Sequence, residues 1–89
     1  MKENIEEIRL TEIVGSELCI ASEDGQKAHD SIKRALMKGK RVKISFKNVD
    51  DLTSAFLNSA IGQLYGEFSD DELKSKLSVA DASNEDLVL

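Results

Sequence analysis

The sequence predicts the α/β fold class, with a mixed β-sheet that carries amphipathic helices on one face. Val42, Ile44 and Phe46 alternate with polar residues, which is the period of a strand with one buried side. Two segments that flank this strand, residues 25–38 and 54–65, repeat apolar residues at helical spacing. The one-sided alternation in the strand indicates that helices cover one face of the sheet and that the other face is more exposed to solvent.

The first part of the chain is expected to form two strands. Ile5 and Ile8 also have a helical spacing, but Ile8, Leu10 and their β-branched neighbours favour a strand, and Gly15 with Ser16 ends it. Residues 17–21 provide a second short apolar run. Because only a short break separates the two runs, we expect a β-hairpin.

The clearest predicted element is the helix that follows this pair of strands. Ala28, Ile32 and Leu36 recur at helical spacing, and charged residues occupy the opposite side. Gly39 lies just past the last turn, where a glycine commonly ends a helix. The strand over residues 42–46 comes next and is expected to be central in the sheet.

A strand–turn–helix unit is the most informative part of the chain. Asn48 and the pair Asp50–Asp51 mark the turn, and Thr53 or Ser54 then offers an oxygen to a free N–H of the first helical turn. The two adjacent hydroxyls are either an ordinary cap or a switch, because the positive field at a helix start favours an added phosphate. We expect this helix to end near Gly66.

A shorter helix and a last strand are expected after Gly66. Ser69 to Glu72 has the pattern of a capping box, and the helix that it opens places Leu73 and Leu77 inward. Residues 78–81 are expected to form a short strand.

The 89 residues are expected to make one domain, with a core from about residue 8 to residue 80. A second cap-like pattern near the end of the chain makes residues 81–89 a partial helix or a tail. The apolar end, Leu87–Leu89, predicts association with a second copy, most simply as a two-fold dimer.

Composition narrows the classes of partner. A formal net charge of −5 and only three Phe, one Tyr and no Trp count against direct binding of nucleic acid. No apolar run approaches the roughly 20 residues of a membrane span, and the first residues do not resemble a signal peptide. A single cysteine cannot form an internal disulfide. We therefore expect a cytoplasmic protein.

The residues that could carry chemistry do not form a recognisable enzyme site. Cys19 and His29 are a conceivable nucleophilic pair, but Cys19 lies in an apolar run, where an inert thiol with a raised pKa is expected. His29 has no second histidine or cysteine nearby, and Asp50 and Asp51 lack a third metal ligand. The sequence therefore predicts no enzyme activity, no cofactor and no metal site.

The segment from Val42 to Leu64 resembles the STAS domains, the family of anti-sigma-factor antagonists. Its motif is an apolar strand, an Asn-Val turn at residues 48–49, the apolar Leu52, and then Thr53 and Ser54 at a helix start. The version with Thr-Ser-x-Phe-Leu is more similar to the STAS-like domain of unknown function (DUF4325 group). In all, the resemblance covers about residues 8–80.

The resemblance implies a protein-binding module of a regulatory kind. In the antagonists, the serine at this helix start is phosphorylated by a histidine-kinase-like ATPase that also binds the antagonist, and the matching position here is Ser54. We expect this ATPase or another protein as partner. The residues expected at the phosphorylation and contact surface are Asp51, Thr53, Ser54, Phe56 and Asn58.

Two other classes of function stay open from the residues. The first is a small acidic inhibitor or mimic of phage type that blocks a nucleic-acid-binding partner through its carboxylates. Such a mimic needs its acids gathered on one face, whereas a STAS-like module needs a solvent-facing hydroxyl at the helix start. The second is an enzyme that uses Cys19, which loss of activity on alkylation would reveal.

Overall fold

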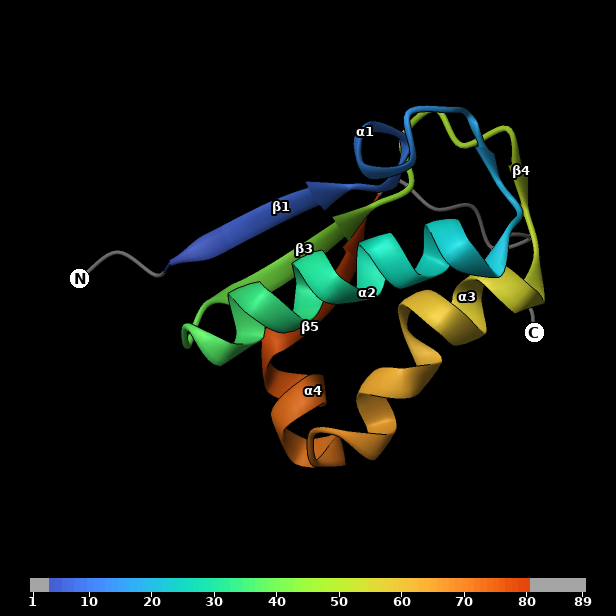
Figure 1. Cartoon of the computed structure of the whole chain (residues 1–89). Coiled ribbons are helices and arrows are strands. Elements are labelled where there is room, and N and C mark those ends of the chain that lie inside the picture. The colour runs from blue at the N-terminus through green and yellow to red at the C-terminus, as the bar shows by residue number, and fades with distance from the viewer. Residues whose placement is uncertain (1–3, 81–89) are drawn as a thin grey trace.

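The structure is a computed structural model that describes residues 4–80, in which helices pack beside a small set of strands (Figure 1). In chain order the elements are β1 (Ile5–Arg9), α1 (Leu10–Val14), β2 (Leu18–Cys19), α2 (Ser22–Met37), β3 (Arg41–Ser45), β4 (Asp51–Leu52), α3 (Ser54–Ala60), the 3₁₀ helix η1 (Gly62–Gly66), α4 (Asp70–Lys76) and β5 (Leu77–Ala80). The predicted α/β fold class is confirmed.

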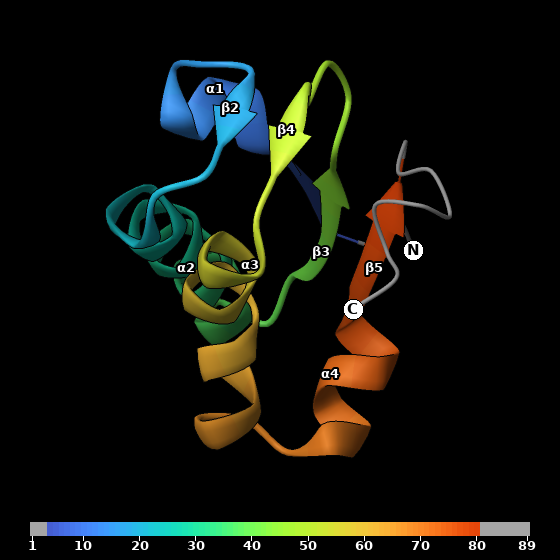
Figure 2. The same ribbon diagram turned by 90° about the vertical axis from the view of Figure 1, so that its right-hand side faces the viewer.

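The strands form two parallel sheets (Figure 2). The larger sheet has the order β1-β3-β5, so β3 is central, as the alternation predicted. Ile8 lies beside Ile44 in this sheet, and Val79 lies beside Ile44 on the other side. The smaller sheet pairs β2 with β4. Every pairing among residues 4–80 is parallel, so the antiparallel part of the expected mixed sheet is absent from this region.

The expected hairpin at the start of the chain is wrong. β1 and β2 belong to different sheets, and residues 10–14 form a helical turn between them. Leu10, Ile13 and Val14 have the spacing i, i+3 and i+4 of a helix face, and Leu10 is fully buried. Gly15 ends the turn with a φ of 77°, a left-handed conformation that suits glycine. The helical pattern was hidden because it overlaps a strand-like alternation.

α2 and α3 pack against each other on one face of the larger sheet (Figure 2). The predicted inward face of α2, with Ala28, Ile32 and Leu36, is buried. On β3, Val42 and Ile44 are fully buried beneath the helices. The core also includes Ile8, Leu10, Cys19, Ala35, Phe46, Phe56, Ala60, Leu64 and Leu73. The prediction that both helices cover one face of a sheet centred on residues 42–46 is confirmed.

The ends of the helices agree with the sequence only in part. Gly39 follows α2 with a φ of 79°, as its position predicted. The helix expected to run to Gly66 ends instead at Ala60, and residues 62–66 continue as a 3₁₀ helix. Gly62 stands at this change, where a glycine weakens an α-helix. Tyr65, which the pattern placed on the apolar face, is exposed.

The last described elements follow the predicted order. Ser69 caps α4 by accepting a hydrogen bond from the Glu72 N–H at 3.2 Å, and Leu73 is buried. Leu77–Ala80 forms the expected short strand, β5. The expected partial helix or tail and the dimer contact through Leu87–Leu89 lie outside the described residues. Within residues 4–80, none of the helices has the length and apolar character that a membrane crossing requires.

Candidate functional site

The start of α3 is held in place by the smaller sheet. β4 pairs with β2, which sets Leu18 beside Asp51 and Cys19 beside Leu52. Thr53 follows Leu52, the last paired residue of β4, and its N–H donates to the Cys19 carbonyl at 3.1 Å. The helix therefore begins at a fixed point, immediately after a strand that is anchored by its neighbour.

The two adjacent hydroxyls at this point have different roles. The Thr53 hydroxyl donates to the Ile20 carbonyl at 2.7 Å and accepts from the Phe56 N–H at 3.1 Å. Thr53 is therefore the N-cap of α3, and it also ties the helix to the segment after β2. Ser54 is exposed, and its hydroxyl makes no hydrogen bond to the described residues. The sequence left the cap open between these residues, and the structure assigns it to Thr53.

The other predicted contact residues divide between surface and core. Asn58 is exposed one helical turn after Ser54, so the two lie on the same side of α3. Asp51 is also exposed, and its carboxylate accepts a hydrogen bond from the Leu52 N–H at 2.9 Å. Phe56 is fully buried between the helices and the sheet. Its packing role fixes α3, and Phe56 is therefore not part of the exposed surface.

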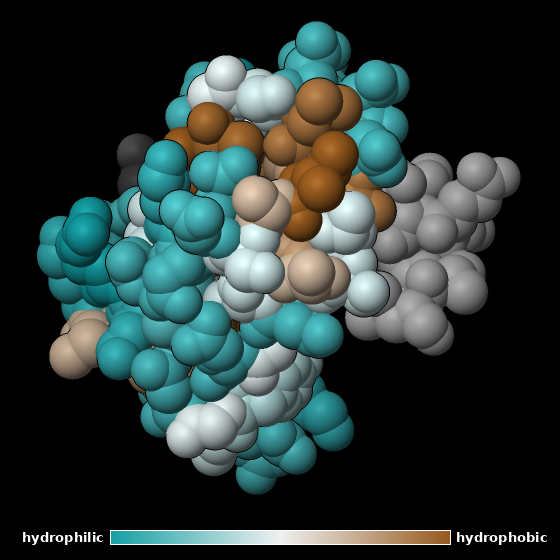
Figure 3. Space-filling view, turned by 45° about the vertical axis from the view of Figure 1, so that its right-hand side comes forward, coloured by the Kyte–Doolittle hydropathy of each residue, from teal (hydrophilic) through white to brown (hydrophobic). Residues whose placement is uncertain are grey.

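Two exposed apolar residues, which the sequence did not single out, lie on β2 and just after it, beside the strand that leads into α3. Leu18 is 47% exposed and Ile20 is 41% exposed, although both flank the fully buried Cys19. Ala55, the residue after Ser54, is exposed as well. Figure 3 shows hydrophobic surface gathered at the end of the molecule where β2 and β4 lie. The alternation Leu18–Cys19–Ile20 was the available signal, because a strand that turns one apolar residue inward turns its neighbours outward.

Three carboxylates border this end of the molecule. The Asp50 N–H donates to the Glu17 carbonyl at 2.8 Å, which brings Glu17 close to Asp50 and Asp51. None of the three carboxylates forms an ion pair with another described residue. The exposed surface around Ser54 is therefore apolar in its middle and acidic at one border.

Cys19 and His29, the two residues considered for catalysis, are both buried, and each has different surroundings. Cys19 is fully buried, and desolvation, with a further contribution from Asp24, raises the pKa of its thiol. The thiolate, which is the nucleophilic form, is therefore disfavoured. His29 instead binds Glu67: its Nε2 donates to Oε1 at 2.5 Å, since a carboxylate only accepts.

The His29–Glu67 contact joins α2 to the residue that follows η1. Glu67 also accepts a hydrogen bond from the Lys33 Nζ at 2.9 Å, and Gln26 contacts the second ring nitrogen of His29 at 3.1 Å. The hydrogen bonds from His29 and Lys33 lower the pKa of the Glu67 carboxyl. The sequence did not indicate this pair, because 38 residues separate its members. Both ring nitrogens of His29 thus have structural partners.

Comparison of the sequence with models of known protein families identifies the family of the chain. The model of the STAS-like domain of unknown function (DUF4325) matches residues 24–87, which is more than half of the chain. This chain belongs to the STAS-like family. The match begins within α2, so β1, α1 and β2 of this STAS-like domain precede the matched span. No curated protein and no solved structure matches the chain.

Proposed function

We propose that this STAS-like domain is a non-enzymatic module that binds another protein through the surface at the start of α3. We define this contact surface as Leu18, Ile20, Asp51, Ser54 and Asn58. The observation that carries the proposal is the difference between the hydroxyls of Thr53 and Ser54. Thr53 uses its hydroxyl fully within the fold, while Ser54 presents its hydroxyl to solvent beside exposed apolar side chains.

The chemistry of the surface defines the partner that would fit it. Leu18 and Ile20 offer apolar area whose burial would drive association. The carboxylates of Glu17, Asp50 and Asp51 at the border would favour a partner with basic residues around an apolar centre. The resemblance to the anti-sigma-factor antagonists makes a histidine-kinase-like ATPase the first partner to test.

Phosphorylation of Ser54 is the regulation that we propose for this surface. A phosphate adds about −1.5 to −2 charges at neutral pH, next to Asp51 and beside apolar area. The charge is compatible with the first turn of a helix, so the fold is expected to persist. At a contact fitted to a neutral hydroxyl, however, the same charge would be buried without a partner and would weaken binding.

Two variants of Ser54 test the proposal. Ser54→Ala should preserve binding, whereas Ser54→Asp should weaken it by about 1–3 kcal/mol if the charge is buried at the contact. Ser75→Asp is the matched control, because Ser75 is exposed on α4, away from the contact surface. Binding would be measured by calorimetry with a histidine-kinase-like ATPase of the same genome, and by affinity capture from the native host.

The apolar part of the surface has its own test. Ile20→Lys should abolish capture of the partner, while Met37→Lys, a change at an exposed apolar residue near the end of α2, should leave it unchanged. Equal recovery of every bound protein with Ser54→Asp, Ile20→Lys and both controls would contradict the proposal.

The acidic-mimic alternative draws on one observation, the group formed by Glu17, Asp50 and Asp51. Most other described carboxylates are paired with bases, as Glu6 is with Lys40 and Glu72 is with Lys76. A mimic would lose its binding when Asp50 and Asp51 are both replaced by asparagine, and it would keep binding in Ser54→Asp. The module proposed here instead loses binding in Ser54→Asp, and replacing Asp50 and Asp51 weakens its binding without abolishing it, because the carboxylates only border the contact.

A further inference from the structure

We propose that the edge of β5 pairs with β5 of a second copy of this chain, so that the two larger sheets join into one continuous sheet. β5 pairs with β3 on one side, and no strand of the described region pairs with its other side (Figure 2). This edge differs from the contact through Leu87–Leu89 that the sequence predicted. It also lies apart from the contact surface at the start of α3, so the inference goes beyond the proposed function.

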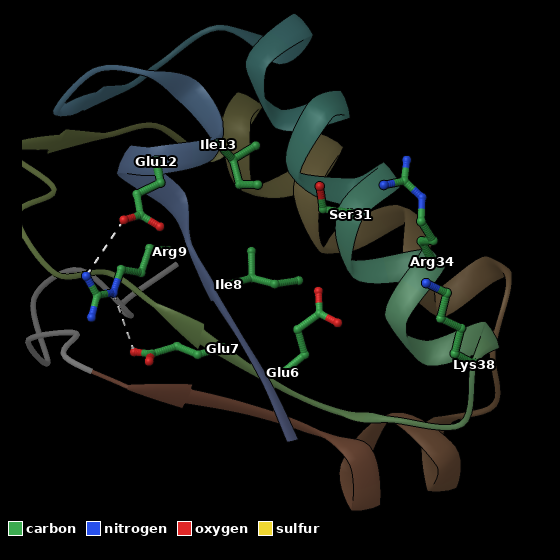
Figure 4. A pocket seen from close by; sticks show the side chains of 9 residues that line it. All are labelled: Glu6, Glu7, Ile8, Arg9, Glu12, Ile13, Ser31, Arg34 and Lys38. Carbon is green, nitrogen blue, oxygen red and sulfur yellow. Dashed lines mark ion pairs between the residues drawn. The ribbon is translucent and has the colours of Figure 1, made fainter. Parts of the chain in front are cut away.

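The opposite edge of the sheet, β1, is unsuited to a second copy. Three of its five residues are charged, and charged side chains on an edge strand commonly prevent pairing with another chain. Two β1 strands paired antiparallel about their middle would set Glu7 opposite Glu7, and like charges directly opposite each other destabilise a sheet. The groove of about 150 Å³ beside β1 is also highly charged, and Arg9 there pairs with both Glu7 and Glu12 (Figure 4).

β5 has none of this protection. Its four residues are uncharged, with the sequence Leu-Ser-Val-Ala. An edge strand without charges can pair with another chain, and pairing with a second copy sets no like charges opposite each other within the strand. Of the two edges of the larger sheet, β5 is therefore the one that can accept an identical strand.

Val79 is the residue of β5 whose backbone can bond to an added strand. The Phe46 N–H donates to the Ala80 carbonyl at 3.0 Å, so the backbone groups of Ala80 point toward β3. These groups alternate in direction along a strand, and Val79 therefore directs its N–H and its carbonyl away from β3. The N–H of Leu77 is already bonded to the Leu73 carbonyl at the end of α4. Val79 thus offers both a donor and an acceptor to a second strand.

The side chain of Val79 is exposed although it belongs to the face that the helices cover. Val79 lies beside Ile44 in the sheet, and Ile44 is fully buried. Because β5 is at the edge, however, Val79 remains 44% exposed. A second strand beside β5 would remove this apolar area from water, which favours association.

Antiparallel pairing about Val79 uses its backbone and its side chain together. The Val79 of one copy then lies opposite the Val79 of the other, and the N–H of each can donate to the carbonyl of the other. Side chains directly opposite each other on one face of a sheet are in contact, so the two valines cover each other. Ser78 of each copy lies opposite Ala80 of the other. The arrangement is a two-fold dimer in which both copies use the same surface.

The length of β5 sets the strength of this dimer. A stable interface buries about 800 Å² on each partner, which takes about 20–30 residues a side. β5 contributes only four residues. We therefore expect a weak dimer that forms as the protein concentration rises and dissociates on dilution.

Sedimentation velocity of the full chain, from micromolar to millimolar protein, measures this association. The wild type should shift toward the dimer as the concentration rises. Val79→Lys should weaken the dimer at least tenfold, because it sets like charges opposite each other. Ile5→Lys is the matched control on the β1 edge, where Ile5 is 57% exposed, and it should change the association less than twofold.

Two further measurements test the pairing about Val79. A mixture of Val79→Lys with Val79→Glu should form more dimer than either variant alone, because opposite charges then meet across the two-fold axis. In the wild type, hydrogen exchange of the Val79 amide should slow as the concentration rises. The amide of Leu77, which is bonded within each copy, should change less than twofold. The exchange measurement needs no variant, so it holds even if a substitution unfolds the protein.

A protein that stays monomeric at millimolar concentration would overturn the inference. A dimer that Val79→Lys leaves intact would also overturn it, because the contact would then lie elsewhere. A disulfide from Val79→Cys to a different protein of the native host would assign the edge to another partner. Val79→Lys should bind the partner of α3 as the wild type does, and Ser54→Asp should dimerise as the wild type does. Failure of this inference is therefore distinguishable from failure of the proposed function.

Discussion

Replacing Gly25 with alanine should destabilise the fold, because the two helices above the sheet touch at this glycine. A Cβ on Gly25 would lie 2.6 Å from the Phe56 carbonyl oxygen and 2.7 Å from the Cβ of Ser59. Ordinary contacts of a Cβ are 3.4–4 Å. The nearer atom belongs to the backbone of α3, so no side-chain rotation can relieve the overlap, and α2 and α3 must move apart.

The expected magnitude follows from two opposing terms. Overpacking of a core costs about 1–3 kcal/mol, and the rigid backbone partner places this site near the upper end. Alanine is favoured over glycine in a helix by about 1 kcal/mol, which offsets part of the cost. The net loss should be about 2 kcal/mol of unfolding free energy. For a domain of this size, that loss lowers the melting temperature by roughly 8–16 °C.

Urea unfolding followed by circular dichroism measures this loss directly. Gly62→Ala is the matched control, because the nearest atom to its new Cβ is the Asn58 Oδ1 at an ordinary 3.5 Å. The control should leave stability within about 1 kcal/mol of the wild type. Ser59→Gly should cost less in the Gly25→Ala background than in the wild type, since it removes one of the two overlaps. A Gly25→Ala protein at least as stable as the wild type would refute the close contact between α2 and α3.

Three further changes test other parts of the structure. Thr53→Ala should lower the unfolding free energy by about 1–2 kcal/mol through loss of the α3 cap, while Ser54→Ala should change it by less than about 0.5 kcal/mol; similar melting curves for the pair would argue against the assigned cap. Phe46→Ala should cost about 3–5 kcal/mol in chemical denaturation, because Phe46 is 3% exposed in the core, and an unchanged midpoint would remove it from the core. The pKa of Glu67 is lowered in the folded protein, so its contribution to stability is present above its ordinary pKa of about 4.3 and is lost as the pH falls through the lowered value. Glu67→Gln should therefore lose stability at neutral pH and show a flatter decline in acid than the wild type, and parallel pH profiles would contradict the His29–Glu67 pairing.

The sequence by itself determined the elements whose signals are local. The alternation of Val42, Ile44 and Phe46 predicts β3 because strand side chains point to opposite faces. Gly39 marks the end of α2 because a left-handed residue is needed there, and Ser69 marks the start of α4 because its oxygen replaces a missing backbone partner. The STAS-like family could be identified from the same short motif around Thr53 and Ser54.

Tertiary structure alone decided the features that depend on distant partners. Leu10 satisfies both a strand pattern and a helix pattern, and only its burial in the core, where α1 packs against α2, made the helix the outcome. From the sequence, Thr53 and Ser54 are equivalent candidates for the cap of α3. In the structure, the Thr53 hydroxyl donates a hydrogen bond to the Ile20 carbonyl, and Ser54 is exposed. The His29–Glu67 pair and the groove beside β1 likewise join segments that are far apart in sequence. Local patterns record the preferences of single elements, whereas parallel pairing and side-chain contacts between elements appear only when the chain has brought them together.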